Sequence, residues 1–82
     1  MYEEMFQLHA DLLKALSHPK RLEVVNLLRK NSLNVSEMLD MLGLPQANLS
    51  QHLMILTEAG VVETEKKGKE VFYKLAHKNF IK

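Results

Sequence analysis

Cysteine is absent from this 82-residue chain, which excludes disulfides, thiolate metal sites and cysteine nucleophiles. Its absence leaves the cytoplasm as the default compartment, because disulfide frameworks belong to secreted proteins. Long apolar runs are also missing: no stretch of about 18 apolar residues could span a membrane, and the N-terminus lacks a signal-peptide pattern. The sequence therefore predicts no membrane partner.

Repeats, low-complexity tracts and linkers are missing as well, so residues 1–82 are interpreted as one small domain. A chain of this length buries only about 60 to 65% of its unfolded surface, which makes its own core marginal. A partner subunit would stabilise it.

The formal net charge of +1 is spread unevenly. Residues 1–42 carry five basic and six acidic side chains, whereas residues 43–82 carry six and four. Four of the later lysines fall in one short segment: Lys66, Lys67, Lys69 and Lys74. A polyanion would meet the chain there.

Apolar residues at helical spacing predict a first helix over residues 2–16. It ends at Ser17-His18-Pro19. Proline suits the first turn of a helix, so Ser17 or His18 caps a second helix that runs from about Pro19 to Lys30.

Asn34 and Glu37 form a capping-box pattern, which opens a short third helix. Gly43 ends that helix, since glycine readily adopts the left-handed conformation at a helix C-terminus. A fourth helix follows over residues 46–59 and is closed by Gly60.

After the fourth helix the apolar period changes from 3.6 residues to two. Residues 61–66 and 70–75 are rich in Val, Phe, Tyr and Thr and predict two strands, with Gly68 supplying the positive φ of a tight turn. The predicted fold class is mainly α with a small β-hairpin. The third and fourth helices match a helix-turn-helix, and the hairpin over residues 62–75 occupies the place of a wing.

The fourth helix combines an apolar stripe with an uncharged polar face. At about 100° per residue, Leu49, Leu53 and Leu56 share one side. Glutamine and asparagine can pair with adenine edges and serine with any base edge, whereas a carboxylate would be repelled by phosphates. The candidate base contacts are Gln46, Ala47, Asn48, Ser50 and Gln51. The alternative is a solvated face, although such faces favour Lys and Glu.

Four segments in register resemble the ArsR/SmtB family of winged-helix repressors. They are "LLKALSHPKRLEVVNLL", "VSEMLDMLGL", "QANLSQHLMILTEAGVV" and "GKEVFYKL". The resemblance covers roughly residues 8 to 76. It implies a homodimeric transcriptional repressor that leaves its operator, a double-stranded DNA site, when an inducer binds; the sequence does not identify the inducer.

The resemblance assigns the hairpin to sequence-independent DNA contacts. Its tip carries Lys66, Lys67 and Lys69, and the ring of Tyr73 is expected under the wing. The alternative is a solvated turn, because three acidic residues nearly balance these lysines: Glu63, Glu65 and Glu70. Arg21 would contact a backbone phosphate or pair with an acidic neighbour, and both interpretations stay open.

No metal or cofactor is predicted. The thiol-based sensors of this family place a Cys-x-Cys pair where Asn34 and Ser36 stand here, and neither is a soft ligand. A second family site lies on a fifth helix, and the chain stops where that helix would start. The histidines show no spacing for three or four convergent ligands. His18 and His52 are interpreted as structural, and His9 and His77 as exposed.

Enzymatic activity is not predicted, because the Ser-His pairs lack an orienting acid and the chain leaves little room for a substrate pocket. Two hypotheses remain. The first is a DNA-binding regulator that reads an operator half-site with helix 46–59 and touches the backbone with wing 62–75. The second is a module for protein–protein contact or dimerisation, such as the N-terminal part of a longer regulator. Residues 45–57 lack aromatic and arginine anchors, which favours the first hypothesis. Met54 and Ile55 are the only residues there that favour the second.

The first helix has an apolar arc of about 160°, wider than the little over 100° that one core requires. The arc predicts a second apolar partner, and the family resemblance implies that this partner is the same helix of a second subunit, with one edge between the subunits comprising Tyr2, Phe6, His9 and Leu13. The other is predicted to hold the monomer together and comprises Leu8, Leu12 and Leu16. In a competing interpretation, the first edge packs on Phe80 and Ile81 of the same chain.

Overall fold

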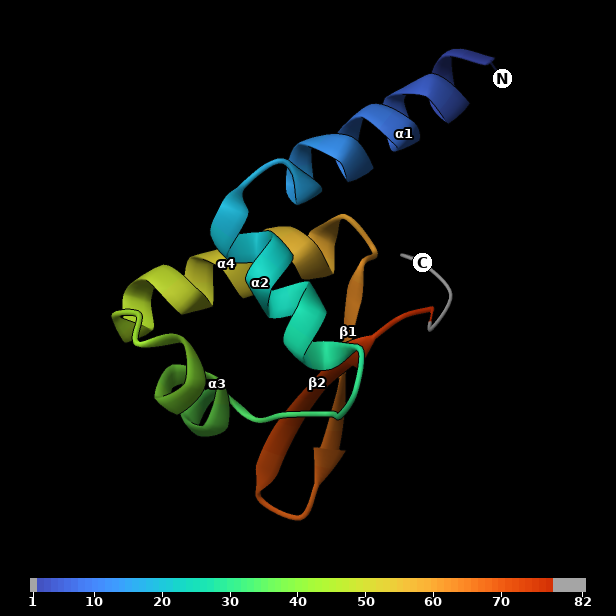
Figure 1. The fold of residues 1–82 in the computed structure, drawn as a ribbon. Coiled ribbons are helices and arrows are strands. Elements are labelled where there is room, and N and C mark those ends of the chain that lie inside the picture. The colour runs from blue at the N-terminus through green and yellow to red at the C-terminus, as the bar shows by residue number, and fades with distance from the viewer. Residues whose placement is uncertain (1, 78–82) are drawn as a thin grey trace.

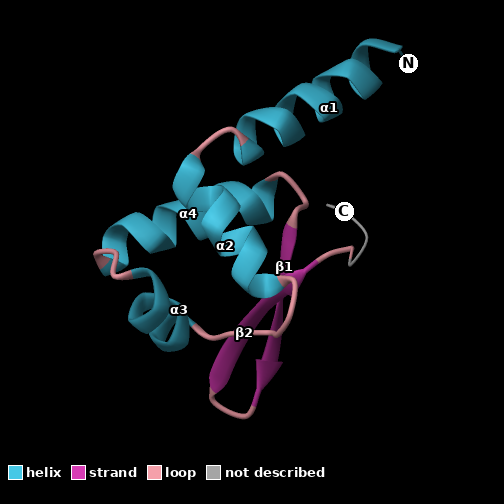
Figure 2. Ribbon diagram, in the orientation of Figure 1, coloured by secondary structure: helices cyan, strands magenta, loops and turns pink. Residues whose placement is uncertain are grey.

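The computed structural model describes the backbone of residues 2–77 and the side chains from residue 4 onward. Its elements, in chain order, are α1 (Tyr2–Leu16), α2 (Pro19–Leu28), α3 (Val35–Leu42), α4 (Gln46–Glu58), β1 (Val62–Lys67) and β2 (Glu70–Leu75) (Figures 1 and 2). The two strands form one antiparallel sheet. This order confirms the predicted winged helix-turn-helix, although α2 ends two residues before Lys30 and α4 one residue before Ala59.

Local capping interactions set the helix boundaries. The His18 Nδ1 accepts a hydrogen bond from the Lys20 N–H at 3.1 Å, so His18 rather than Ser17 caps α2. The predicted capping box of α3 is confirmed: Asn34 Oδ1 accepts from the Glu37 N–H at 2.8 Å, and Glu37 Oε1 accepts from the Asn34 N–H at 2.9 Å. Gly43 ends α3 with a φ of 66°, a conformation that favours glycine.

The core lies between α2, α3, α4 and the base of the hairpin. Its buried side chains are Ala15, Val24, Val25, Leu28, Leu33, Met38, Leu49, Leu53, Leu56, Val61, Val62 and Leu75. Leu33 also pairs with Tyr73 through two backbone hydrogen bonds of 3.0 and 2.8 Å, which attach the α2–α3 loop to β2. The wing is therefore held firmly to the helical body.

Helix α1 projects away from the rest of the fold, and only its C-terminal end lies against other elements (Figure 1). There Ala15 is buried, and the half-buried Leu12 and Leu16 pack against the core. The prediction that Leu8 belongs to this set is wrong, because its side chain is 68% exposed. The helix has already diverged from the body one turn before Leu12.

Candidate nucleic-acid interface

Helix α4 presents the predicted uncharged face to solvent. Leu49, Leu53 and Leu56 are buried and fix the helix against the core, as predicted. The five candidate base contacts are all exposed: Gln46, Ala47, Asn48, Ser50 and Gln51. None of them makes a side-chain hydrogen bond within residues 4–77. Their amides and hydroxyl are therefore available to a ligand.

Two histidines connect α4 to the start of α2. The rings of His18 and His52 lie 4.7 Å apart between centroids, tilted by 53°. The His52 Nδ1 is buried and has no hydrogen-bond partner among the described residues. Burial lowers the pKa of His52, and the nearby His18 and Arg21 lower that pKa further. His52 thus lies on the core side of α4, as predicted. Within the described part of the chain, no group of three or more metal-binding side chains is found.

The environment of His52 makes the stability of the fold depend on pH. In the unfolded chain His52 takes up a proton near pH 6.5, whereas the folded state resists that proton until a lower pH. The unfolded state therefore binds more protons in this window, and we expect the free energy of unfolding to decrease as the pH falls below about 6.5.

Urea denaturation at pH 7.5 and pH 5.5 measures this effect. His52→Gln should lose less stability between the two pH values than the wild-type chain does. Asn26→Ala, a change at an exposed position on α2 that removes no titratable group, is the control and should behave as wild type. Equal losses in wild type and His52→Gln would show that this ring carries none of the pH dependence.

Arg21 has a structural role that neither of its two predicted interpretations includes. Its Nε donates to the backbone oxygen of Ala15 at 2.6 Å, and its Nη2 donates to that of Lys14 at 3.4 Å. These oxygens belong to the last turn of α1, where helices leave carbonyl groups unpaired. Arg21 forms no ion pair with the acidic residues of the described chain. It ties α2 to α1, and its contact with a DNA phosphate stays a prediction.

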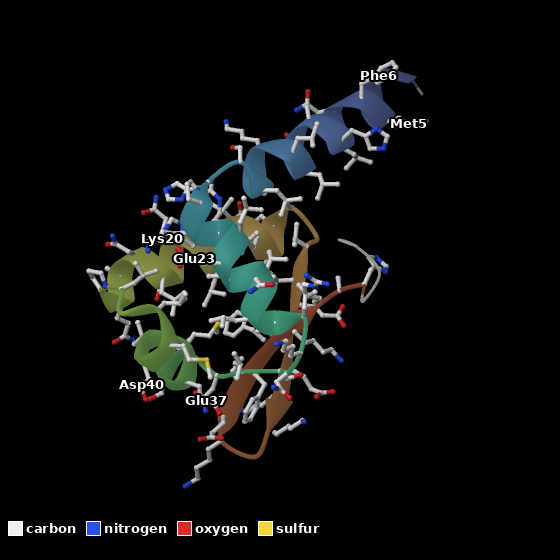
Figure 3. The ribbon with its side chains drawn as sticks, viewed as in Figure 1. Met5, Phe6, Lys20, Glu23, Glu37 and Asp40 are labelled. Carbon is white, nitrogen blue, oxygen red and sulfur yellow. The ribbon has the colours of Figure 1, made fainter. Side chains whose placement is uncertain are left out.

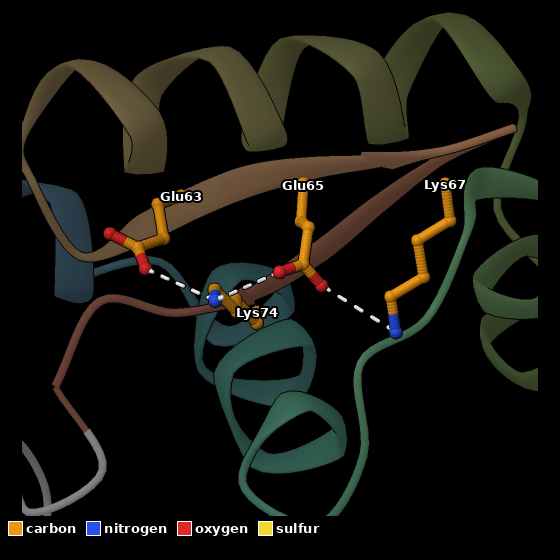
Figure 4. Close-up of polar contacts among 4 residues, drawn as sticks. All are labelled: Glu63, Glu65, Lys67 and Lys74. Atoms are coloured by element: carbon orange, nitrogen blue, oxygen red, sulfur yellow. Dashed lines mark ion pairs between the residues drawn. The ribbon is translucent and has the colours of Figure 1, made fainter.

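The outer face of the wing holds a network of ion pairs (Figure 4). Lys74 Nζ lies 3.6 Å from carboxylate oxygens of both Glu63 and Glu65, and Lys67 Nζ lies 3.5 Å from Glu65. Lys67 also lies 5.4 Å from the centroid of the Phe72 ring. Part of the basic charge of the wing is thus balanced within the hairpin itself.

The other two lysines near the tip of the wing differ from Lys67 and Lys74. Lys66 pairs with Val71 across the two strands. Because side chains of a strand alternate between its two faces, Lys66 lies on the same face of the sheet as the buried Val62, and Lys67 lies on the opposite face. Lys66 and Lys69 are exposed and form no ion pair with the described residues. Their charges are therefore not balanced by any carboxylate of the described hairpin. Tyr73 is half-buried against the core, as expected for a ring under the wing.

Several large apolar side chains of α1 are exposed to solvent. Phe6 is 68% and Leu13 67% exposed, and Met5 and Phe6 lie at the end of the helix far from the other elements (Figure 3). His9 is also exposed. The side chain of Tyr2, and residues 80 and 81 of the competing interpretation, lie outside the described residues. No described helix is long and apolar enough to cross a membrane.

Comparisons with known proteins agree with this architecture. Residues 18–64 match the model of a family described as "Bacterial regulatory protein, arsR family". The chain is 45% identical over 73 residues to the HTH-type transcriptional repressor SmtB of Mycobacterium tuberculosis, covering 89% of this chain and 54% of that protein. It is 46% identical over 66 residues to the biofilm growth-associated repressor of Xylella fastidiosa, covering 80% of this chain and 58% of that protein. The chain thus spans little more than half the length of these two relatives.

A solved structure supports the same assignment. The crystal structure of Rv0081 from M. tuberculosis superposes with a TM-score of 0.82 at 36% identity, over 92% of this chain and 76% of that one. Both curated relatives above are named as repressors, and neither name denotes an enzyme. The predicted resemblance is thereby confirmed: the chain belongs to the arsR family of bacterial regulatory proteins.

Proposed function

We propose that the chain, as one DNA-binding domain over residues 1–82, acts as a homodimeric transcriptional repressor. It reads an operator half-site with helix 46–59 and contacts the DNA backbone with wing 62–75. The observation that carries this proposal is the exposed N-terminal part of α4, where Gln46, Asn48, Ser50 and Gln51 are polar and uncharged and make no side-chain hydrogen bonds within the described residues. The repressor names of the relatives support it.

The geometry of α4 suits a base-reading role. Gln46 and Gln51 are five residues apart, which separates them by about 7.5 Å along the helix axis. Base pairs are stacked about 3.4 Å apart, so the two amides would address different base pairs. Each can form a bidentate pair with adenine. Lys66 and Lys69 would supply the backbone contacts that hold the helix in register.

A binding selection on random duplex DNA, read by sequencing, tests the proposal. We expect a two-fold symmetric preferred site and an affinity that falls steeply with salt, because neutralised phosphates release counterions. A neutral protein of similar size is the control. Failure to bind any duplex above that control at low salt would overturn the DNA-binding function.

The wing lysines are expected to contribute unequally to this salt dependence. Lys66→Ala or Lys69→Ala should each reduce the slope of log affinity against log salt concentration by about one, equally on all sequences. Lys67→Ala should reduce it less, because Glu65 already lies 3.5 Å from its Nζ. Titration of a labelled duplex at several salt concentrations gives these slopes. A larger effect for Lys67→Ala than for Lys66→Ala would show that the ion pair with Glu65 does not keep Lys67 from the DNA backbone.

The alternative function is a protein–protein module, and the structure leaves it less support than the sequence does. Met54 and Ile55 are the only residues of the α4 segment that favour an apolar docking surface. Ile55 is half-buried and packs against the core, so only Met54 remains exposed. Its place on α4 is better explained within the DNA-binding proposal.

A further inference from the structure

Met54 is the one large apolar side chain that α4 exposes in the described structure, with 55% of its surface accessible. It does not belong to the core cluster, and it is not among the α1 residues proposed for the dimer interface. Burying it elsewhere would be favourable, since removing apolar surface from water contributes about 25 cal/mol per Å².

Met54 shares a stripe of α4 with two of the candidate base contacts. At about 100° per residue, Ala47, Gln51 and Met54 lie within about 60° of one another around the helix. Gln51 and Met54 are three residues apart, or about 4.5 Å along the axis. This separation is close to one base-pair step of about 3.4 Å. A helix that places Gln51 against one base pair thus brings Met54 to its neighbour.

The chemistry of the major groove offers one apolar partner for such a side chain. The C5-methyl of thymine is the apolar feature among the donors and acceptors that base pairs present there. A thioether is flexible and polarisable and adapts to an irregular apolar surface. It can neither donate a strong hydrogen bond nor neutralise a phosphate, so its contacts with other base edges or with the DNA backbone would add little to the affinity.

We propose that Met54 is a specificity-determining residue whose thioether packs on the C5-methyl of a thymine, one base-pair step from the pair read by Gln51. The inference rests on the DNA-binding function proposed above and adds one predicted feature of the operator. Exposure of the side chain means that its replacement should not disturb the fold.

The test is a double-mutant cycle between protein and DNA. Each thymine of the selected half-site is replaced in turn by uracil, which removes only the C5-methyl. Wild-type protein should lose about fourfold in affinity at one thymine, the equivalent of about 0.8 kcal/mol for one buried methyl group. Met54→Ala should bind the thymine and uracil forms of that position equally, with an unchanged salt slope. Met54→Leu, which keeps an apolar side chain of similar volume, should retain the discrimination.

Met41→Ala is the matched control, because Met41 is a 59% exposed methionine on α3 rather than on α4, and it should discriminate as wild type does. Thermal unfolding of each variant checks that the fold is intact. The inference is overturned if Met54→Ala distinguishes thymine from uracil as well as wild type does, or if the selected half-site contains no thymine. In both cases the DNA-binding function stands. A wild-type chain that binds no duplex overturns that function and the role of Met54 together.

Discussion

Phe6→Glu is expected to convert a homodimer into a folded monomer that binds its operator poorly. Phe6 on the projecting part of α1 and Leu13 nearer its C-terminal end are each about two-thirds exposed. A second copy of the same helix would bury both. A carboxylate at position 6 would have to be desolvated in that interface, which is costly without a partner charge. The monomer fold should survive, because the nearest fully buried residue in the described part of α1, Ala15, lies about two and a half turns from Phe6.

Loss of the dimer should have a large effect on DNA binding. A two-fold dimer engages two half-sites about one helical turn, or about 34 Å, apart. The second half-site is then bound at a high effective concentration, and linked binding of this kind raises affinity by about 10² to 10⁴. We therefore expect Phe6→Glu to weaken operator binding by about a hundredfold or more, without change in the contacts of a single half-site.

Sedimentation analysis at tens of micromolar decides the oligomeric state of both forms. Ala10→Glu is the matched control, since it adds the same charge about one turn from Phe6, at an exposed position on the polar side of α1, where Lys14 four residues later can pair with it. It should remain dimeric. A wild-type chain that sediments as a monomer would remove the dimer and the two-fold operator. A Phe6→Glu variant that remains dimeric would show that the dimer interface does not include this edge of α1.

Gln51→Ala is the second change with a large expected effect. Its amide is exposed and makes no hydrogen bond within the described protein, so its loss should leave the stability of the fold unchanged. A bidentate pair with adenine contributes about 1 to 3 kcal/mol of discrimination, equivalent to about 5-fold to 150-fold in affinity. Gln46→Ala should have a similar effect at a different base pair.

Repeating the random-duplex selection with Gln51→Ala measures the effect directly. One position of the preferred site should become degenerate while the others keep their preference. Asn26→Ala, a change of an exposed amide on α2, should leave both affinity and preference as in wild type. If Gln51→Ala weakens all sequences equally, Gln51 contacts the backbone rather than a base edge.

Short-range signals in the sequence determined the elements of this fold. Two of these signals are the capping box of Asn34 and Glu37 and the helix-ending Gly43, whose φ is 66°. Both act over a few residues, so they can be recognised in the sequence without knowledge of the tertiary structure. The same holds for the leucine stripe of α4, because a helical period of 3.6 residues decides which side chains can share one face. The candidate base-reading face follows from that stripe, as the side opposite the buried leucines.

Tertiary structure alone decided which side chains are buried and which polar groups are paired. The direction of α1 exposes Leu8, although helical spacing groups it with Leu12 and Leu16. The turn between α1 and α2 brings the Arg21 guanidinium onto carbonyl groups six and seven residues earlier in the chain.

The same reason applies to the wing and to the histidine pair. Strand register places Lys67 beside Glu65 and Phe72 and leaves Lys66 on the opposite face. His18 and His52, far apart in sequence, meet only because α2 packs on α4. The sequence shows which charged and aromatic residues are present, but not which of them pair. Pairing depends on distances of a few ångströms, and these are set by how the helices and the hairpin pack around the shared core.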